Sequence, residues 1–230
     1  MRRALLAGAC AAALASSTSL AATRSPAGTR LTVYAAASLT GVLPRIDPAQ
    51  RYSFGGSNSL ATQIAQGAPA DVFASANTSI PQQLYEQGLV EKPVVFTRNA
   101  LVLIVPRANP AGIHSVFDLR RSGVKLDVAA AGVPAGDYTR TVLHNLGLDD
   151  VLAKVALGEA DAGFVYATDA KAVRGKVATI AIRQSAQPSV RYAAAVVRGS
   201  AHRAAARRFV ARLLTKAAQR KLRAAGFLPR

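Results

Sequence analysis

The sequence predicts an α/β fold, because short apolar segments typical of buried strands alternate with helical segments along most of the chain. Half of the 230 residues are hydrophobic, which is enough to build a substantial core. Strands separated by helices favour parallel pairing, since a parallel pair needs a crossover between its members. We therefore expect mostly parallel sheets covered by helices.

The expected strands are short apolar runs that end near Gly, Pro or polar residues. The clearest run covers residues 100–105 and ends at Pro106, a pattern typical of a central strand. In chain order, the expected strands are 31–36, 52–54, 71–75, 100–105, 125–131, 162–166, 177–182 and 190–197.

The expected helices mostly follow these strands, and glycines mark several of their ends. They cover residues 57–66, 80–87, 137–146, 151–157 and 201–225. The last one is amphipathic. Its residues Phe209, Leu213, Ala217 and Leu222 recur at helical spacing, so we expect them to face the core.

The first 22 residues have the three-part layout of a secretory signal peptide. Arg2 and Arg3 form the basic start, residues 4–15 the apolar run and residues 16–22 the small-residue segment. We therefore expect export, removal of residues 1–22 and a periplasmic or other extracytoplasmic location. A lipid anchor at Cys10 is the alternative, which the short apolar run before it disfavours.

The chain is strongly basic, with 29 Lys and Arg against 12 Asp and Glu and a net charge of +17. In the last expected helix the basic side chains form a stripe. The basic stripe consists of Arg203, Arg207, Arg212, Lys216 and Arg220. A solvated helix face is the simplest interpretation. The alternative is an exported basic protein that binds polyanions or membrane surfaces.

The residues that metal sites and enzymes need are sparse. Cys10 is the only cysteine, and the three histidines lie far apart in the sequence. The sequence lacks Gly-x-Ser-x-Gly, and the Gly55-Gly56-Ser57 turn lacks the lysine of a phosphate-binding loop. Tryptophan is absent and aromatics are few, which disfavours base stacking. We expect no enzyme, no cofactor and no nucleic-acid partner.

Three segments, 35–40, 54–60 and 132–138, share one design, in which a strand ends and small or hydroxyl residues begin a helix. The first N–H groups of a helix lack partners and its dipole favours an anion. Ser38 and Ser57 can each offer a hydroxyl and an N–H. For either serine alone an ordinary helix cap is the simpler explanation. Three such turns together predict an anion site at the carboxyl ends of the strands.

Four motifs resemble the periplasmic molybdate-binding proteins of ABC transporters, and the similarity extends from about Leu31 to Phe227. The motifs are AAASLT at 35–40, GAPADVF at 67–73, VPAG at 133–136 and GEADAGFVY at 158–166 with Asp169. The resemblance implies a two-lobed type II periplasmic binding protein fold whose hinge is crossed twice. It places lobe one at 30–98 and 190–230, and lobe two at 99–189.

The resemblance also implies a site in which neutral donors hold a tetrahedral dianion. Carried over, Ser38 and Ser57 each give a hydroxyl and an N–H, Ala135 gives its N–H and Tyr166 its phenol. Taken alone, a strand tyrosine such as Tyr166 more often packs in the core. The implied ligand is molybdate or tungstate, so molybdenum is expected only within the bound oxyanion. The implied partners are the membrane subunits of an ABC transporter, and a monomer is expected.

One departure from the family pattern concerns the end of this site. Family members carry an added strand and loop before the helix that gives a further N–H donor, whereas this chain passes directly from Leu148 to Asp149. Leu148 is the nearest match to that donor. We therefore expect lobe two to be shortened after Leu148 and this side of the site to be incomplete.

Overall fold

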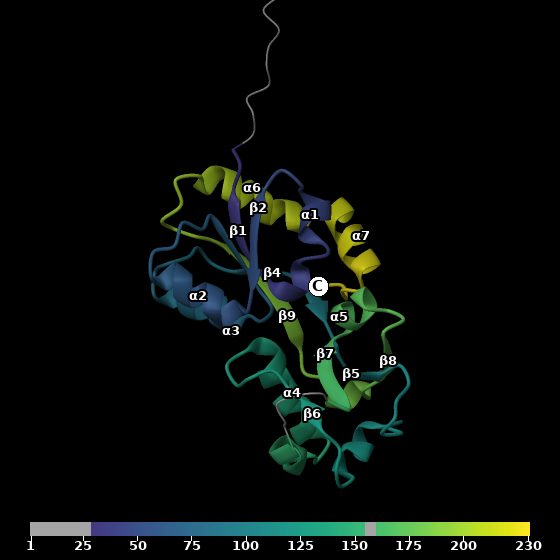
Figure 1. Cartoon of the computed structure of the whole chain (residues 1–230). Helices are drawn as coiled ribbons and strands as arrows, with labels where there is room; N and C mark the ends of the chain where they lie inside the picture. The colour runs from purple at the N-terminus through teal and green to yellow at the C-terminus, as the bar shows by residue number, and fades with distance from the viewer. Residues whose placement is uncertain (1–28, 155–159) are drawn as a thin grey trace, which may run out of the picture.

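A computed structural model describes residues 29–154 and 160–230 of the chain. It has two sheets, each with its own helices, which form two lobes arranged end to end (Figure 1). The expected signal peptide and Cys10 lie outside the described residues. The expected α/β, two-lobed fold is confirmed.

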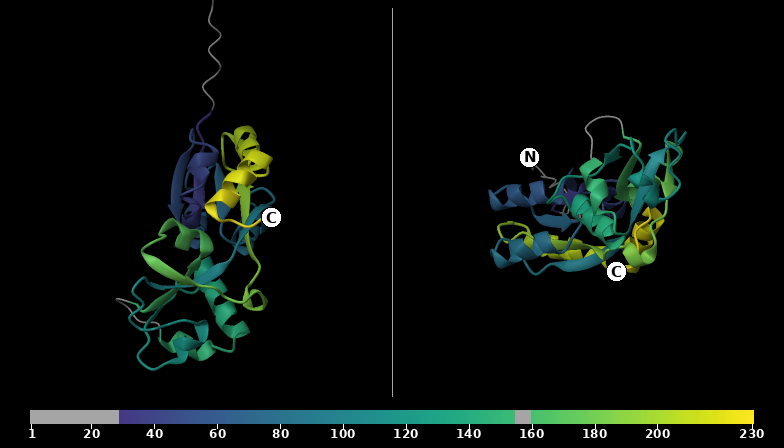
Figure 2. Two further views of the ribbon diagram at one scale, coloured as in Figure 1. Left: turned by 90° about the vertical axis from the view of Figure 1, so that its right-hand side faces the viewer. Right: turned by 90° about the horizontal axis from the view of Figure 1, so that it is seen from below.

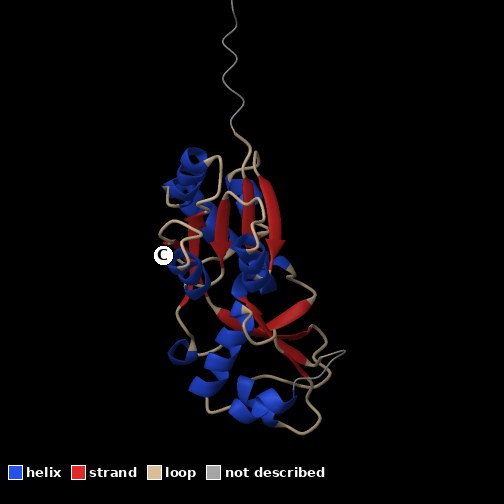
Figure 3. Cartoon of the chain, turned by 90° about the vertical axis from the view of Figure 1, so that its left-hand side faces the viewer, coloured by secondary structure: helices blue, strands red, loops and turns tan. Residues whose placement is uncertain are grey.

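The five-stranded sheet of lobe one has the order β2-β1-β3-β9-β4. The first three strands are parallel, and β9 is antiparallel to both of its neighbours. The strands run along the long axis of the molecule (Figure 3). Their bounds are β1 Thr32–Ala36, β2 Arg51–Gly55, β3 Val72–Ser75, β4 Val94–Asn99 and β9 Val190–Val196.

Helices cover both faces of this sheet. Alternate residues of β3 point to opposite faces, so Phe73 packs in one cluster with Leu60 and Leu84, while Val72 shares another with Phe209. Figure 2 shows the same arrangement from two further directions, with the yellow C-terminal helices on lobe one. The helices are α1 Leu43–Ile46, α2 Ser57–Ala65, α3 Ser79–Glu86, α6 Arg203–Leu213 and α7 Lys216–Ala225.

The four-stranded sheet of lobe two has the order β6-β7-β5-β8. β5 is antiparallel to both neighbours, and the short β6 is parallel to β7. The strands are β5 Leu101–Pro106, β6 Leu126–Asp127, β7 Ala162–Tyr166 and β8 Val177–Ile180. The helices are α4 Pro134–Asn145 and α5 Ala167–Ala172, with 3-10 turns at Val116–Arg120, Asp149–Lys154 and Gln184–Ala186.

The expectation of mostly parallel sheets is wrong in detail. Among the strand pairs of the described residues, three are parallel and four are antiparallel. The chain leaves lobe one after β4 and returns from lobe two as β9. The returning strand therefore enters the first sheet in the opposite direction to β3.

Several elements differ in extent from those expected. β4 is an unexpected strand. It begins with three apolar residues and ends in Thr97, Arg98 and Asn99, so it lacks a continuous apolar pattern. The expected strand 125–131 contains only β6, because residues 128–131 lead into the loop before α4. The expected helix 151–157 is a 3-10 turn at Asp149–Lys154, and residues 155–159 are not described.

The expected single helix 201–225 is two helices. Thr215 caps the start of α7, where its hydroxyl accepts a hydrogen bond from the Ala218 N–H at 3.3 Å. The break changes the helical phase, so Ala218 and Leu222 face the core and Ala217 is exposed. The expected inward orientation is therefore right for Phe209, Leu213 and Leu222 and wrong for Ala217.

The chain crosses between the sheets twice, once between β4 and β5 and once between the turn at 184–186 and β9. The core is continuous through this junction, where the ring of Tyr192 packs edge-on against Tyr166, Phe96 and Phe227. Apolar packing therefore holds the lobes together at the hinge.

Residues after α7 return to β4 beside the first crossing. Leu228 and Arg98 exchange backbone hydrogen bonds of 2.8 and 3.2 Å, and the Thr97 hydroxyl donates to the Leu228 carbonyl at 2.9 Å. The Arg98 guanidinium also donates to the Pro229 carbonyl at 2.6 Å. These contacts attach the C-terminal segment to the last residues before the hinge.

Candidate functional site

A cavity of about 350 Å³ lies where the ends of strands from both sheets meet. Lobe one lines it with the ends of β1 and β2 and the start of α2. Lobe two lines it with β7 and the start of α4. Four predicted site residues line this cavity together: Ser38, Ser57, Ala135 and Tyr166. A larger cavity of about 650 Å³, near Arg51 and His202, contains none of them.

Ser57 is the first residue of α2 and is only 1% exposed. Its hydroxyl oxygen accepts a hydrogen bond from the Ala76 N–H at 3.1 Å, which fixes the side chain toward β3. A hydroxyl can accept and donate at the same time. Among the described residues the Ser57 hydrogen has no acceptor, so it is available to a ligand.

Ser38 lies in the 3-10 turn Ala37–Leu39, directly after β1. A turn therefore stands where the sequence predicted a helix start. The side chain is half-buried, and its oxygen lies 2.8 Å from the phenol oxygen of Tyr192. The serine thus borders the cavity on one side and a buried tyrosine on the other.

Ala135 and Gly136 are the second and third residues of α4, after Pro134. Val133 provides no side-chain cap, so the N–H groups of Ala135 and Gly136 have no intrahelical acceptor. A Cβ atom at Gly136 would overlap the backbone carbonyls of Ala129 and Ala130. Glycine therefore lets the helix start approach the 128–131 loop closely, beside the cavity that Ala135 lines.

Tyr166 ends β7 and is 5% exposed. Its phenol oxygen is buried and has no hydrogen-bond partner among the described residues. Leaving a buried hydroxyl unpaired costs roughly 1–3 kcal/mol. Burial raises the pKa of Tyr166 far above its ordinary value, so the phenol keeps its proton. The cavity therefore contains a hydrogen-bond donor that has no acceptor among the described residues and is available to a ligand.

Asp169 lies in the first turn of α5 and also lines the cavity. Burial raises its pKa to about 6, against the effect of a hydrogen bond from the Tyr166 backbone N–H. The sequence assigned no role in the site to this residue. Its cavity position was indicated only by the motif that it shares with Tyr166.

The structure does not bring Leu148 to the cavity, which corrects the expected fifth donor. Leu148 is fully buried in the core, and its N–H donates to the Leu143 carbonyl at 2.8 Å. Gly147, with a φ of 66°, turns the backbone at the end of α4 so that this N–H returns to the helix. The N–H is used within the fold and cannot contact a ligand in the cavity.

The donors that meet in the cavity are neutral. No lysine, arginine or histidine is among the described residues that line it, and its charged members are Asp127 and Asp169. Within the described ranges, no three His, Cys, Asp or Glu side chains gather as a metal site would require. The arrangement can therefore hold an anion through fixed dipoles and hydroxyls.

A family profile described as bacterial extracellular solute-binding protein matches residues 31–228. The chain belongs to this family. The molybdate-binding protein ModA of Mycobacterium tuberculosis is 37% identical to this solute-binding protein over 218 residues, covering 86% of this chain and 84% of the relative. ModA of Haemophilus influenzae is 34% identical, covering 87% and 91%.

Solved structures support the same fold. The periplasmic molybdate-binding protein of Azotobacter vinelandii matches this solute-binding protein with a TM-score of 0.76 at 24% identity, covering 87% of this chain and all of that one. The sulfate-binding protein SubI of Mycobacterium tuberculosis matches with a TM-score of 0.71 at 20% identity, covering 87% of each chain. At these identities the likeness concerns the fold.

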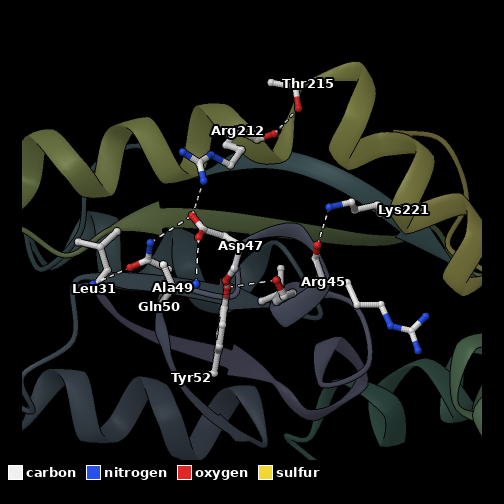
Figure 4. A network of polar contacts seen from close by, with 10 residues as sticks. Leu31, Arg45, Asp47, Ala49, Gln50, Tyr52, Arg212, Thr215 and Lys221 are labelled. Carbon is white, nitrogen blue, oxygen red and sulfur yellow. Dashed lines mark hydrogen bonds and ion pairs between the residues drawn. The ribbon is translucent and has the colours of Figure 1, made fainter. Parts of the chain in front are cut away.

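Part of the basic stripe of this solute-binding protein has a structural role. Arg212 donates to the carboxylate of Asp47 at 2.6 Å, and Asp47 is only 5% exposed (Figure 4). Arg207 pairs with Glu91 at 2.6 Å. Arg203, Lys216 and Arg220 are exposed.

In the part of the chain that the structure covers, no helix combines the length and apolarity needed to cross a bilayer.

Proposed function

We propose that this solute-binding protein captures molybdate or tungstate and delivers it to the membrane subunits of an ABC importer. The observation that carries the proposal is the buried, unpartnered hydroxyl of Tyr166 in the same cavity as the Ser57 hydroxyl and the start of α4. The relatives named for molybdate binding support the choice of ligand.

The chemistry of the donors favours a fully deprotonated oxyanion. Ser38, Ser57 and Tyr166 bring hydroxyls, and Ala135 brings its N–H group. An oxyanion that carries a proton would need an acceptor, and the carboxylates of the cavity that can provide one are Asp127 and Asp169. A protonated competitor would leave some of these donors without an acceptor, so the site should bind the dianion more tightly.

We further propose that the lobes divide as 30–98 with 190–230 and 99–189, and that the anion draws them together. Ser38 and Ser57 belong to the first lobe, and Ala135 and Tyr166 to the second. Because Leu148 is directed into the core, the site has one donor fewer than the family resemblance implies. Sulfate discrimination should therefore be weaker than in relatives with the full donor set.

The remaining elements of the proposal concern the state of the protein. It acts outside the cytoplasm after removal of residues 1–22, as a monomer without catalytic activity or a resident cofactor. Molybdenum is present only as the transported oxyanion, held by the residues named above.

Isothermal titration of the mature chain with molybdate, tungstate and sulfate tests the proposal. One molybdate or tungstate should bind per chain and raise the unfolding midpoint, as any ligand specific for the native state does. Ser57→Ala should weaken binding by ~1.5–3 kcal/mol, the range for a charge-assisted hydrogen bond. Ser79→Ala, at the start of α3 and outside the cavity, is the matched control. Absence of binding of both oxyanions by the wild-type chain would refute the proposal.

A second candidate function is binding to polyanions or membrane surfaces, favoured by the exposed Arg203, Lys216 and Arg220 of the basic stripe. Such binding should weaken steeply as salt rises, because it releases counterions. Steep salt dependence that is lost when these three residues become glutamine, and that is insensitive to molybdate, would support this second function.

A further inference from the structure

We infer that Tyr192 and Asn99 are positioning residues that fix the Ser38 hydroxyl as a hydrogen-bond donor toward the bound oxyanion. The inference rests on the proposed function. It adds a series of hydrogen-bonded side chains that lie behind the cavity. Tyr192 lies on β9 and is fully buried, while Asn99 ends β4 and is also buried. Neither residue lines the cavity.

The orientation of the Asn99 amide follows from its partners. Its Oδ1 accepts from the Ala100 N–H at 2.9 Å, which identifies this end of the amide as the acceptor. The opposite end, Nδ2, therefore faces the Thr168 hydroxyl at 2.9 Å and the Tyr192 hydroxyl at 3.3 Å. An amide nitrogen has two hydrogens and accepts none, so it donates to both oxygens.

The direction of the next bond is determined by the first. Because the Tyr192 oxygen accepts from Asn99, its own hydrogen is free to donate elsewhere. The Ser38 oxygen, 2.8 Å away, is the described partner that remains. Burial raises the pKa of Tyr192 well above its ordinary value, so this hydrogen is retained. Tyr192 therefore donates to Ser38.

Ser38 is then left with its own hydrogen to donate, and its side chain borders the cavity. The bonds run in one direction, from amide to phenol to serine hydroxyl to oxyanion. Hydrogen bonds aligned in this way polarise one another. This series of hydrogen bonds thus prevents the Ser38 oxygen from directing a lone pair at the anion, an orientation in which the two would repel each other.

The same series of hydrogen bonds extends across the hinge. Asn99 lies one residue before the crossing to β5, and its second donor bond reaches Thr168 on α5 of lobe two. The Ser38 orientation is therefore linked to the contact between Asn99 and the second lobe.

Tyr192→Phe tests the inference, because it removes the hydroxyl and keeps the ring that packs against Phe96 and Phe227. We expect molybdate affinity to fall about tenfold, as for one lost hydrogen bond to a charged group. Tyr52→Phe is the matched control, since its hydroxyl also bonds within lobe one, to the carbonyls of Leu43 and Asp47, but away from the cavity. That control should leave affinity unchanged.

A double-variant cycle separates positioning from general damage. If Tyr192 acts through Ser38, the double variant Ser38→Ala/Tyr192→Phe should bind no more weakly than Ser38→Ala alone. Additive losses, or wild-type affinity in Tyr192→Phe, would overturn the inference while the proposed function stands. A wild-type chain that binds neither molybdate nor tungstate would overturn both. If Tyr192→Phe does not fold, the same cycle with Asn99→Ala in place of Tyr192→Phe tests the inference.

Discussion

The side-chain amide of Gln187 forms two hydrogen bonds with the main chain of Leu101. Its Oε1 accepts from the Leu101 N–H at 3.0 Å, and its Nε2 donates to the Leu101 carbonyl at 2.6 Å. The two residues belong to the two segments that cross between the sheets. One side chain therefore links the two crossing segments, with the pair of hydrogen bonds that a neighbouring strand would form in a sheet.

Replacing Gln187 by leucine should loosen the hinge. Both main-chain groups of Leu101 would lose their partner, which should lower the free energy of unfolding by ~1–3 kcal/mol. Small-angle scattering of the ligand-free variant should show a broader distribution of lobe separations. Gln184→Leu, on the exposed turn just before the crossing, is the control and should leave both quantities unchanged.

Tyr166→Phe should separate binding from stability. Among the described residues the hydroxyl has no hydrogen-bond partner, so its removal should leave the free energy of unfolding unchanged or slightly higher. Molybdate affinity should fall by ~1.5–3 kcal/mol, because the donor acts only on the ligand. Urea unfolding and titration calorimetry measure the two effects. Lower stability with unchanged affinity would show that Tyr166 is a core residue only.

Asp169 should make the stability of the protein depend on pH. Its pKa is about 6 in the folded state against an ordinary value of 3.8, so between these values the folded state binds more protons than the unfolded state. Stability should therefore fall as pH rises from 4 to 6. Asp169→Asn should remove this slope and be more stable than the wild type at pH 7. Urea unfolding across this range checks the prediction.

The same carboxyl should affect anion binding. Above its pKa Asp169 is negative within the cavity and opposes a dianion. Wild-type affinity for molybdate should decrease as pH rises from 5.5 to 7, relative to Asp169→Asn titrated at the same pH values. Comparing the two proteins cancels changes in the ligand itself. Parallel pH profiles would mean that the carboxyl points away from the bound ion.

Gly136→Ala should damage both the fold and the site. The added methyl group would overlap the carbonyls of Ala129 and Ala130, and overpacking of this kind costs ~1–3 kcal/mol. The shift should move the start of α4, so affinity should fall as well. Gly41→Ala, where a Cβ atom would meet nothing within 4 Å, is the control for thermal unfolding and titration. Equal behaviour of the two variants would contradict the close approach at α4.

The family resemblance implied Ser38, Ser57, Ala135 and Tyr166 together, because each stands in a local motif at a strand end or helix start. Tyr192 and Asn99 have no such signal. Tyr192 lies in an apolar strand, and its partners are 154 and 93 residues away in the sequence. Contacts of this range depend on the assembled fold and leave no pattern among neighbouring residues.

The errors also have local physical causes. The turn at Gly147, directly after the expected helix 137–146, uses the N–H of Leu148 within the fold and removes it from the site. The Thr215 cap splits the last helix and exposes Ala217. The direction of β9 is set by the return of the chain across the hinge. The hydrophobic periodicity within the strand carries no information about that direction.

The attachment of Leu228 to Arg98 suggests how closure of the lobes can be observed. A fluorophore on Leu228, which is 42% exposed, would move with the final residues of β4. A second fluorophore on Phe117, which is 47% exposed in lobe two, would move with the other body. Energy transfer between the two dyes would then convert lobe motion into an optical signal, so that the chain could be developed as an oxyanion sensor.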